Sequence, residues 1–152
     1  MRFLIIEDDT NKARELCLYL SAQFPAAELS QAASFNSGVR QLRQSTYDFV
    51  LLDMTMPTFD RTEKESGGRV RAFAGREVLR EIDRRRISAS VIIVTAFESF
   101  GDAASRVTLE QLRSDLQVEF PSSLVGMIYY DPSNDSWRGA LRDLISQAED
   151  SA

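Results

Sequence analysis

The sequence lacks histidine altogether and contains very little lysine and cysteine. Without histidine the chain can build no histidine-based catalytic triad, no histidine metal site and no phosphohistidine relay. Lysine occurs only as Lys12 and Lys64, so any lysine chemistry has two candidates. The single cysteine, Cys17, excludes an internal disulfide framework and is typical of a reducing cytoplasm.

Long hydrophobic runs and an excess of positive charge are also missing. No apolar run reaches the ~18 residues of a membrane-spanning helix, and Glu7 interrupts the apolar start of the chain too early for a signal peptide. The 23 acidic residues exceed the 18 basic ones, which makes nucleic acid and membranes poor partners. The length of 152 residues predicts one domain, residues 1–152.

Short apolar runs predict the strands of a sheet. Each run is flanked by polar or turn residues, and continuous apolar runs of this length are typical of parallel strands covered by helices on both faces. Four runs are clear and a fifth is weaker and suits an edge strand: Phe3–Ile6, Phe49–Leu52, Val91–Val94, Leu124–Tyr130 and the weaker Ala27–Ala32.

Helical patterns separate these runs. Apolar residues recur at helical spacing in five segments, namely 11–22, 35–44, 75–86, the segment that a capping box opens at Thr108, and 135–148. The alternation predicts an α/β fold with a doubly wound, five-stranded parallel sheet. Two connections, residues 58–74 and 97–107, exceed the ~2–6 residues that are usual here, so we expect extended loops that are functional or disordered.

Carboxylates follow two of the predicted strands. Glu7 and Asp8 come after the first strand and Asp53 after the third, at the sheet edge where ligands bind in open parallel sheets. Like charges that meet there repel one another unless a cation joins them, and Mg²⁺ suits carboxylate and phosphate oxygens. Thr95, after the fourth strand, could donate its hydroxyl to a phosphoryl oxygen. An aspartate beside Mg²⁺ can attack a phosphoryl group and form an acyl phosphate.

Three strand-end motifs in this order resemble the receiver domain of bacterial two-component response regulators. The motifs are Leu4–Asp9, Phe49–Pro57 and Val91–Ala96, and Gly75–Leu79 is similar to the start of that family's third helix. The resemblance covers nearly the whole chain. It implies a flavodoxin-like receiver fold with the strand order 2-1-3-4-5.

The resemblance also implies a role for each residue at the strand ends. Asp53 would be the phosphoacceptor and Thr95 the switch hydroxyl. Glu7 and Asp8 would hold Mg²⁺ together with Asp53 and the backbone carbonyl of Thr55. The chain would be a cytoplasmic, single-domain response regulator that catalyses at most its own phosphorylation and dephosphorylation. Its partners would be a histidine kinase or phosphotransfer protein and a downstream protein target, with a homodimer as a further option.

The chain departs from the family at the lysine that precedes a proline after the fifth strand. Asp131 stands at that position, before Pro132. Lys12 falls on the first predicted helix, so we expect a substitute from the charged connection that follows Asp53. The candidates are Lys64, Arg69, Arg71 and Arg76.

The aromatic switch of the family is also displaced. Counting back from Asp131, its usual position holds Ile128, and Tyr129 and Tyr130 follow directly. Because successive side chains of a strand face opposite ways, either tyrosine is a candidate for the role.

Two other functions stay open. A degenerate receiver would keep the fold and the acidic pocket but act as a phosphorylation-independent interaction or dimerisation module. Asp131 favours it, because a fourth carboxylate would oppose a bound phosphoryl group. A phosphotransfer enzyme would need a general acid or base near Asp53, such as Glu7 or Asp131. It is disfavoured because Thr55 stands where common aspartate-based phosphatases have a second aspartate.

Overall fold

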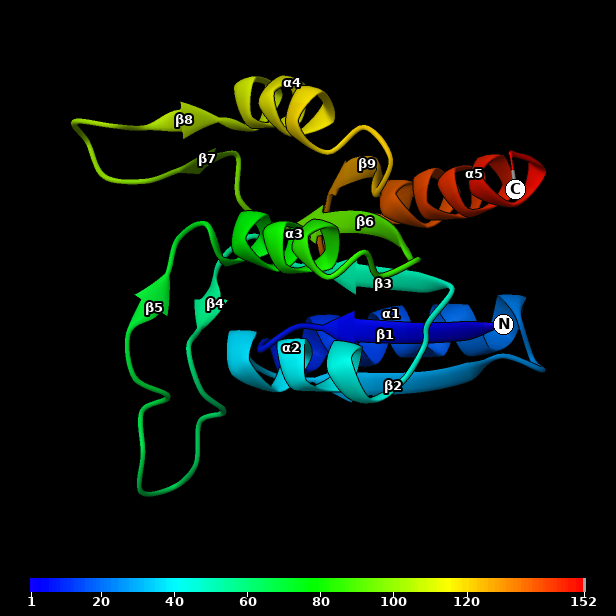
Figure 1. Ribbon diagram of the computed structural model, residues 1–152, viewed down its shortest axis with the longest axis horizontal. Helices are drawn as coiled ribbons and strands as arrows, with labels where there is room; N and C mark the ends of the chain where they lie inside the picture. Colours follow the sequence, from blue (N-terminus) through cyan, green and yellow to red (C-terminus); the bar gives the residue numbers. More distant parts are fainter. Residues whose placement is uncertain (152) are drawn as a thin grey trace.

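A five-stranded parallel sheet forms the centre of the molecule (Figure 1). The computed structural model describes residues 1–151. The strand order β2-β1-β3-β6-β9 is the predicted order 2-1-3-4-5, which is therefore confirmed. The bounds are β1 Arg2–Ile6, β2 Glu28–Ala32, β3 Phe49–Leu52, β6 Ser90–Thr95 and β9 Leu124–Tyr129. Neighbouring strands pair in parallel throughout, so their carboxyl ends share one edge of the sheet.

Helices cover both faces of this sheet and bury two separate apolar clusters. The helices are α1 Thr10–Gln23, α2 Phe35–Gln44, α3 Ala74–Arg84, α4 Leu109–Glu119 and α5 Ser136–Asp150. Side chains of α1 and α5 pack in one cluster, and side chains of α2, α3 and α4 pack in the other. Because each face of the strands is covered, the strands read as continuous apolar runs. No helix within residues 1–151 combines the length and the apolar character needed to cross a membrane.

Side-chain hydrogen bonds start α1 and α4, and a backbone conformation ends α3. The Asp9 carboxylate accepts the backbone N–H groups of Asn11 and Lys12, at 3.0 and 3.2 Å, and so starts α1 directly after β1. The predicted capping box at Thr108 is confirmed. The helix predicted over 75–86 ends earlier, at Arg84, because Arg86 takes a left-handed backbone conformation (φ 53°).

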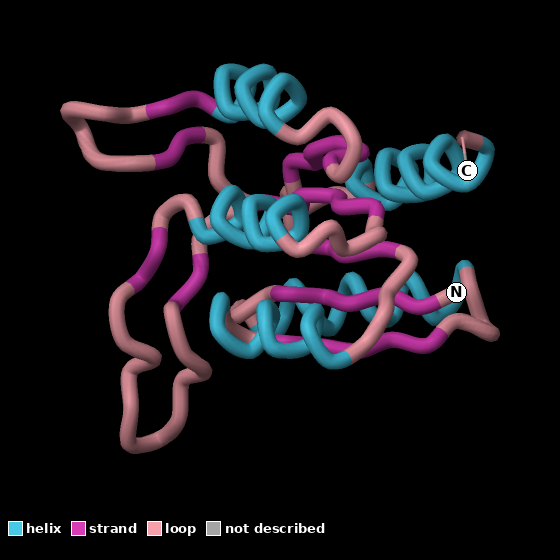
Figure 2. The backbone as a smooth tube through the Cα atoms, in the orientation of Figure 1, coloured by secondary structure: helices cyan, strands magenta, loops and turns pink. Residues whose placement is uncertain are grey.

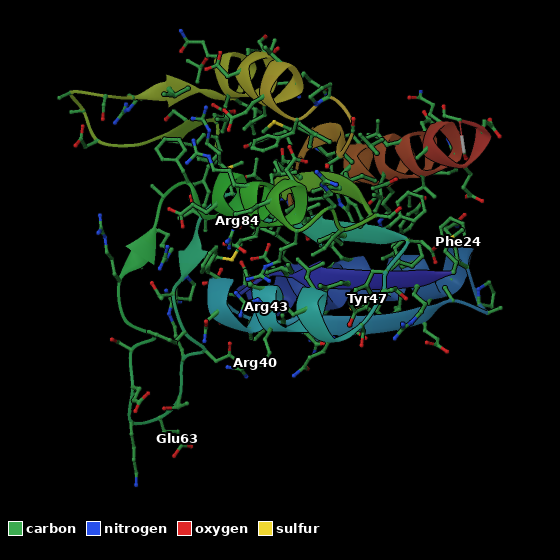
Figure 3. The ribbon with its side chains drawn as sticks, in the orientation of Figure 1. Phe24, Arg40, Arg43, Tyr47, Glu63 and Arg84 are labelled. Atoms are coloured by element: carbon green, nitrogen blue, oxygen red, sulfur yellow. The ribbon has the colours of Figure 1, made fainter. Side chains whose placement is uncertain are left out.

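The two long connections are hairpins, which the sequence did not predict. In one, β4 (Met56–Pro57) pairs with β5 (Val70–Arg71), and in the other β7 (Ser99–Phe100) pairs with β8 (Val107–Thr108). Both extend beyond the carboxyl ends of the central strands (Figures 1 and 2). Figure 3 labels Glu63 near the far end of the first hairpin. Strands of two residues leave no hydrophobic period to detect, which explains why only extended loops were expected.

Candidate functional site

Three carboxylates meet at the carboxyl ends of β1 and β3. Glu7 and Asp8 directly follow β1, and Asp53 directly follows β3, which is the neighbouring strand in the sheet. One oxygen atom of each side chain lies within 4.8 Å of the others. Glu7 and Asp53 are buried and Asp8 is half-buried. The structure therefore brings together the acidic residues that the strand-end pattern singled out.

The two carboxylate oxygens of Asp53 have different environments. Oδ1 accepts the backbone N–H of Met54 at 2.7 Å. Oδ2 lies 3.3 Å from the side-chain nitrogen of Lys12 and accepts no backbone N–H among the described residues. Oδ2 is therefore the oxygen that is not engaged by the backbone.

Lys12 is the site residue that the sequence reasoning missed. Its side chain is only 3% exposed, and its Nζ atom lies 2.5 Å from Glu7 Oε1 and 2.5 Å from the carbonyl oxygen of Val94. The ring of Tyr130 lies 5.8 Å from the same nitrogen. Positions 12, 16 and 20 share one face of α1, and Leu16 and Leu20 are buried against the sheet. This spacing was the signal that could have placed Lys12 at the sheet.

The basic residues expected to replace the missing lysine lie elsewhere. Arg71 pairs with Glu77 at 2.5 Å, and Arg76 pairs with Glu119 at 2.6 Å. Lys64 is exposed on the β4–β5 hairpin, as is Arg69. Within residues 1–151, the ion pairs to the three carboxylates come from Lys12 and from Arg61. In this structure Arg71 and Arg76 pair with other glutamates and Lys64 and Arg69 are exposed, whereas Lys12 lies beside the carboxylates because α1 packs its buried face against the sheet.

The β4–β5 hairpin reaches back to the site through Asp60 and Arg61. The Asp60 carboxylate accepts hydrogen bonds from the hydroxyls of Ser34 and Ser37, at 2.6 and 2.7 Å, and so holds the hairpin at the start of α2. Arg61 then places its guanidinium 3.2 Å from Asp8. The hairpin thus supplies a second positive charge, which is more exposed than Lys12, at the open side of the carboxylates.

Thr95 and Thr55 lie on the elements next to Asp53. Thr95 is fully buried at the end of β6, and its hydroxyl oxygen accepts the backbone N–H of Phe97 at 3.2 Å. Thr55 is half-buried in the turn after Asp53 and donates its hydroxyl to the Ala72 carbonyl at 2.9 Å. The hydroxyl proton of Thr95 remains available for a further acceptor.

Gly75 lets α3 begin against the turn that follows Asp53. Its backbone N–H donates to the carbonyl of Met54 at 3.0 Å. A Cβ atom at this position would stand 3.0 Å from the Asp53 carbonyl oxygen and 3.1 Å from Met54 Cα. The close approach of two backbone segments therefore favours glycine here, because a Cβ atom would crowd both of them.

The two candidate tyrosines face opposite ways, as the strand period predicts. Tyr129 is 38% exposed, whereas Tyr130 is buried and packs against Trp137 with ring centroids 5.3 Å apart. Burial raises the pKa of the Tyr130 hydroxyl above its usual range. Of the two, Tyr130 is the tyrosine in contact with Lys12.

Asp131 is engaged by hydrogen bonds within its own loop. Its Oδ1 atom accepts the backbone N–H and the hydroxyl of Ser133, at 2.9 and 2.7 Å, and its Oδ2 atom accepts the Asn134 amide at 3.0 Å. The hydrogen bonds from Ser133 hold the pKa of Asp131 below its usual range. Asp131 is therefore hydrogen-bonded within its own loop and is not one of the three carboxylates that lie within 4.8 Å of one another.

The electrostatics of the three carboxylates favour a cation. Burial raises the pKa of Glu7 to about 7, against the opposing effect of Lys12 and with a further rise from Asp53. Burial also raises the pKa of Asp8, while Arg61 lowers it and Asp53 raises it further. Oε1 of Glu7 is buried and has no hydrogen bond of good geometry, although it is close to Lys12.

These oxygens suit a hard divalent ion. Carboxylates are ligands that Mg²⁺ prefers, and ligands on opposite sides of such an ion lie about 4.2 Å apart. The 4.8 Å limit on the spacing of the three oxygens is close to this value. The residues present therefore fit Mg²⁺ with small side-chain movements.

Comparison with known proteins places the chain in a family. No family model matches it. It is 34% identical over 145 residues to the uncharacterised protein y4jR of Sinorhizobium fredii, covering 94% of this chain and 95% of the relative. It is 31% identical over 149 residues to the Detocs response regulatory protein DtcB of Enterobacter cloacae, covering 97% and 99%. The chain belongs to the response regulator proteins.

Solved structures agree on the fold. A receiver domain from Methanospirillum hungatei superposes with a TM-score of 0.63 at 18% identity, covering 98% of this chain and 94% of that one. CheY from Borrelia burgdorferi, in a complex with CheX, BeF₃ and Mg²⁺, gives 0.66 at 19%, covering 97% and 87%. TrrA from Thermotoga maritima, in complex with Mg²⁺ and BeF, gives 0.56 at 24%, covering 94% and 97%.

Proposed function

We propose that this chain is a single-domain response regulator that is phosphorylated on Asp53 in a Mg²⁺-dependent reaction. The observation that carries the proposal is the meeting of Glu7, Asp8 and Asp53, with one oxygen of each within 4.8 Å. Such a cluster at the carboxyl ends of parallel strands suits an ion together with a phosphoryl group.

The proposed reaction uses Asp53 as the nucleophile. Oδ2 attacks the phosphorus atom of the donor, an oxygen–phosphorus bond forms, and the bond to the leaving group breaks with its electron pair going to that group. Glu7, Asp8, Asp53 and the carbonyl of Thr55 would hold Mg²⁺, which when bound offsets the negative charge of the phosphoryl oxygens.

Thr95 provides the response to phosphorylation in this proposal. The phosphoryl group adds about −1.5 to −2 charges close to the end of β6. The free proton of the Thr95 hydroxyl can then be donated to a phosphoryl oxygen. The same hydroxyl oxygen accepts the N–H of Phe97. A movement of the Thr95 hydroxyl would therefore displace the backbone at the start of the β7–β8 hairpin.

The partners follow from this role. The donor would be a histidine kinase or a phosphotransfer protein, and the likeness to a response regulatory protein supports such a partnership. Output would pass through protein–protein contact with a downstream target on α4, β9 and α5, or through a homodimer. The proposal includes a cytoplasmic location, no direct contact with nucleic acid, and no enzymatic turnover of other substrates.

Intact mass spectrometry tests this function. The protein is incubated with Mg²⁺ and a small acyl or amido phosphate, and in parallel with its cognate kinase. We expect one phosphoryl adduct that disappears in Asp53→Asn and persists in the control Asp143→Asn, which changes an exposed aspartate of α5. No adduct from either donor would overturn the proposal and favour the phosphorylation-independent module. Repeated turnover of a phosphorylated substrate would favour the phosphotransfer enzyme.

A further inference from the structure

We infer that Lys12 provides the positive charge that pairs with the phosphoryl group, from the first helix rather than from the segment after the last strand. The inference rests on the proposed phosphorylation of Asp53. Its basis is the burial of the Lys12 ammonium beside the acceptor carboxylate, together with the aspartate at position 131, which is hydrogen-bonded within its own loop.

The hydrogen bonding of Lys12 leaves donors for the reacting group. An ammonium group has three N–H donors, and the Val94 carbonyl accepts one of them at 2.5 Å. Glu7 Oε1 and Asp53 Oδ2 are ion-pair partners of the same nitrogen, at 2.5 and 3.3 Å. Because Oδ1 is held by the N–H of Met54, a phosphoryl group on Oδ2 would form next to the Lys12 ammonium.

The partners of Lys12 stabilise its buried ammonium both before and after the phosphorylation of Asp53. A buried ammonium is costly unless charged and polar groups surround it. The Val94 carbonyl and the Tyr130 ring are partners whose charge does not change when Asp53 reacts. Phosphorylation removes the carboxylate charge of Asp53 but adds a more highly charged group at the same oxygen. Lys12 therefore exchanges one anionic partner for a stronger one.

Asp131 is an aspartate and cannot supply a positive charge at the position of the family's lysine. Both of its carboxylate oxygens are occupied within the loop 131–134. A purely structural Lys12, which only neutralises Glu7 and Asp53, would affect metal binding and folding but would not favour a bound phosphoryl group. The two roles therefore differ in their effect on a phosphoryl analogue measured at saturating Mg²⁺.

The site carries a natural spectroscopic reporter. Tyr130 lies against Lys12 and packs on Trp137, which is the single tryptophan of the chain. Trp137 in turn packs against Tyr19 of α1, with ring centroids 5.5 Å apart. A change in the position or partners of Lys12 should therefore alter the fluorescence of Trp137.

The variant experiment compares the two lysines of the chain. Binding of Mg²⁺ and then of beryllium fluoride, a phosphoryl analogue, is measured by Trp137 fluorescence and by fluorine NMR. We expect Lys12→Met to weaken beryllium fluoride binding by about 10- to 100-fold, as expected for loss of one charged hydrogen bond. Mg²⁺ binding should stay equal or become tighter because a competing cation is gone. Lys64→Met is the matched control and should match the wild type. Unchanged beryllium fluoride binding in Lys12→Met would overturn the inference.

A second experiment needs no substitution and holds even if Lys12→Met fails to fold. Lysine labelled with ¹³C at the ε position gives two side-chain signals, one for each lysine. We expect the Lys12 signal to shift when beryllium fluoride is added to the Mg²⁺-saturated protein, while the Lys64 signal stays fixed. Bound beryllium fluoride with an unmoved Lys12 signal would overturn the inference and leave the proposed function intact. A wild-type protein that binds no beryllium fluoride and gives no phosphoryl adduct would overturn both.

Discussion

Replacing Glu7 with glutamine should remove a pH dependence from the stability of the metal-free protein. Burial raises the pKa of the Glu7 carboxyl from 4.5 to about 7. Between these pH values the folded protein keeps a proton that the unfolded chain releases, so the folded state binds more protons. The free energy of unfolding should therefore fall as pH rises from about 4.5 through 7, and the rise in pKa corresponds to roughly 3 kcal/mol.

Denaturant unfolding in the presence of EDTA measures this effect. The midpoint and slope are recorded from pH 5 to pH 8 for the wild type, for Glu7→Gln, and for the control Glu149→Gln, which changes an exposed residue of α5. The wild type and the control should lose up to about 3 kcal/mol more than Glu7→Gln over this range. Parallel curves for the wild type and Glu7→Gln would refute the reasoning, because they would show that Glu7 titrates alike in the folded and unfolded states.

Three further substitutions test other parts of the site and fold. Arg61→Ala should tighten Mg²⁺ binding by about 2- to 5-fold at low salt, because an exposed ion pair to Asp8 no longer competes, and the gain should vanish at high salt. In the same titration Lys64→Ala should bind as the wild type does, and weaker binding by Arg61→Ala would contradict the account. Gly75→Ala should lower the free energy of unfolding by about 1–3 kcal/mol, because its Cβ would crowd the acceptor turn; an unchanged melting temperature would argue against this. Thr108→Ala should cost about 1 kcal/mol in denaturant unfolding through loss of the α4 cap, and no loss would mean that the cap contributes little.

The central sheet could be predicted because burial on both faces leaves a direct trace in the sequence. Phe3–Ile6, Phe49–Leu52 and Val91–Val94 are continuous apolar runs, and all three lie within buried strands. The edge strand gave the weaker signal of Ala27–Ala32, because only part of its surface is covered. Carboxylates placed directly after such runs then meet at one edge, as parallel pairing requires.

The two hairpins and the position of Lys12 could not be predicted, because they depend on contacts between residues far apart in the chain. The hairpins pair only two residues on each side, which is too short for a periodic pattern. Lys12 reaches the carbonyl of Val94, 82 positions away, and this meeting depends on how α1 packs on the sheet. A positive residue on an apolar helical face was visible in the sequence, but its partners were not. Sequence proximity to Asp53 favours the charged connection of residues 58–74 instead.

Locating the acyl phosphate on the chain is the most direct test of the central claim. The protein is phosphorylated in the presence of Mg²⁺, the acyl phosphate is reduced with borohydride to homoserine, and the peptides are mapped by mass spectrometry. The account predicts homoserine at position 53 alone, in the segment Phe49–Pro57, and none when Mg²⁺ is removed. Homoserine at another aspartate, or none at position 53 after incubation with the cognate kinase, would contradict it.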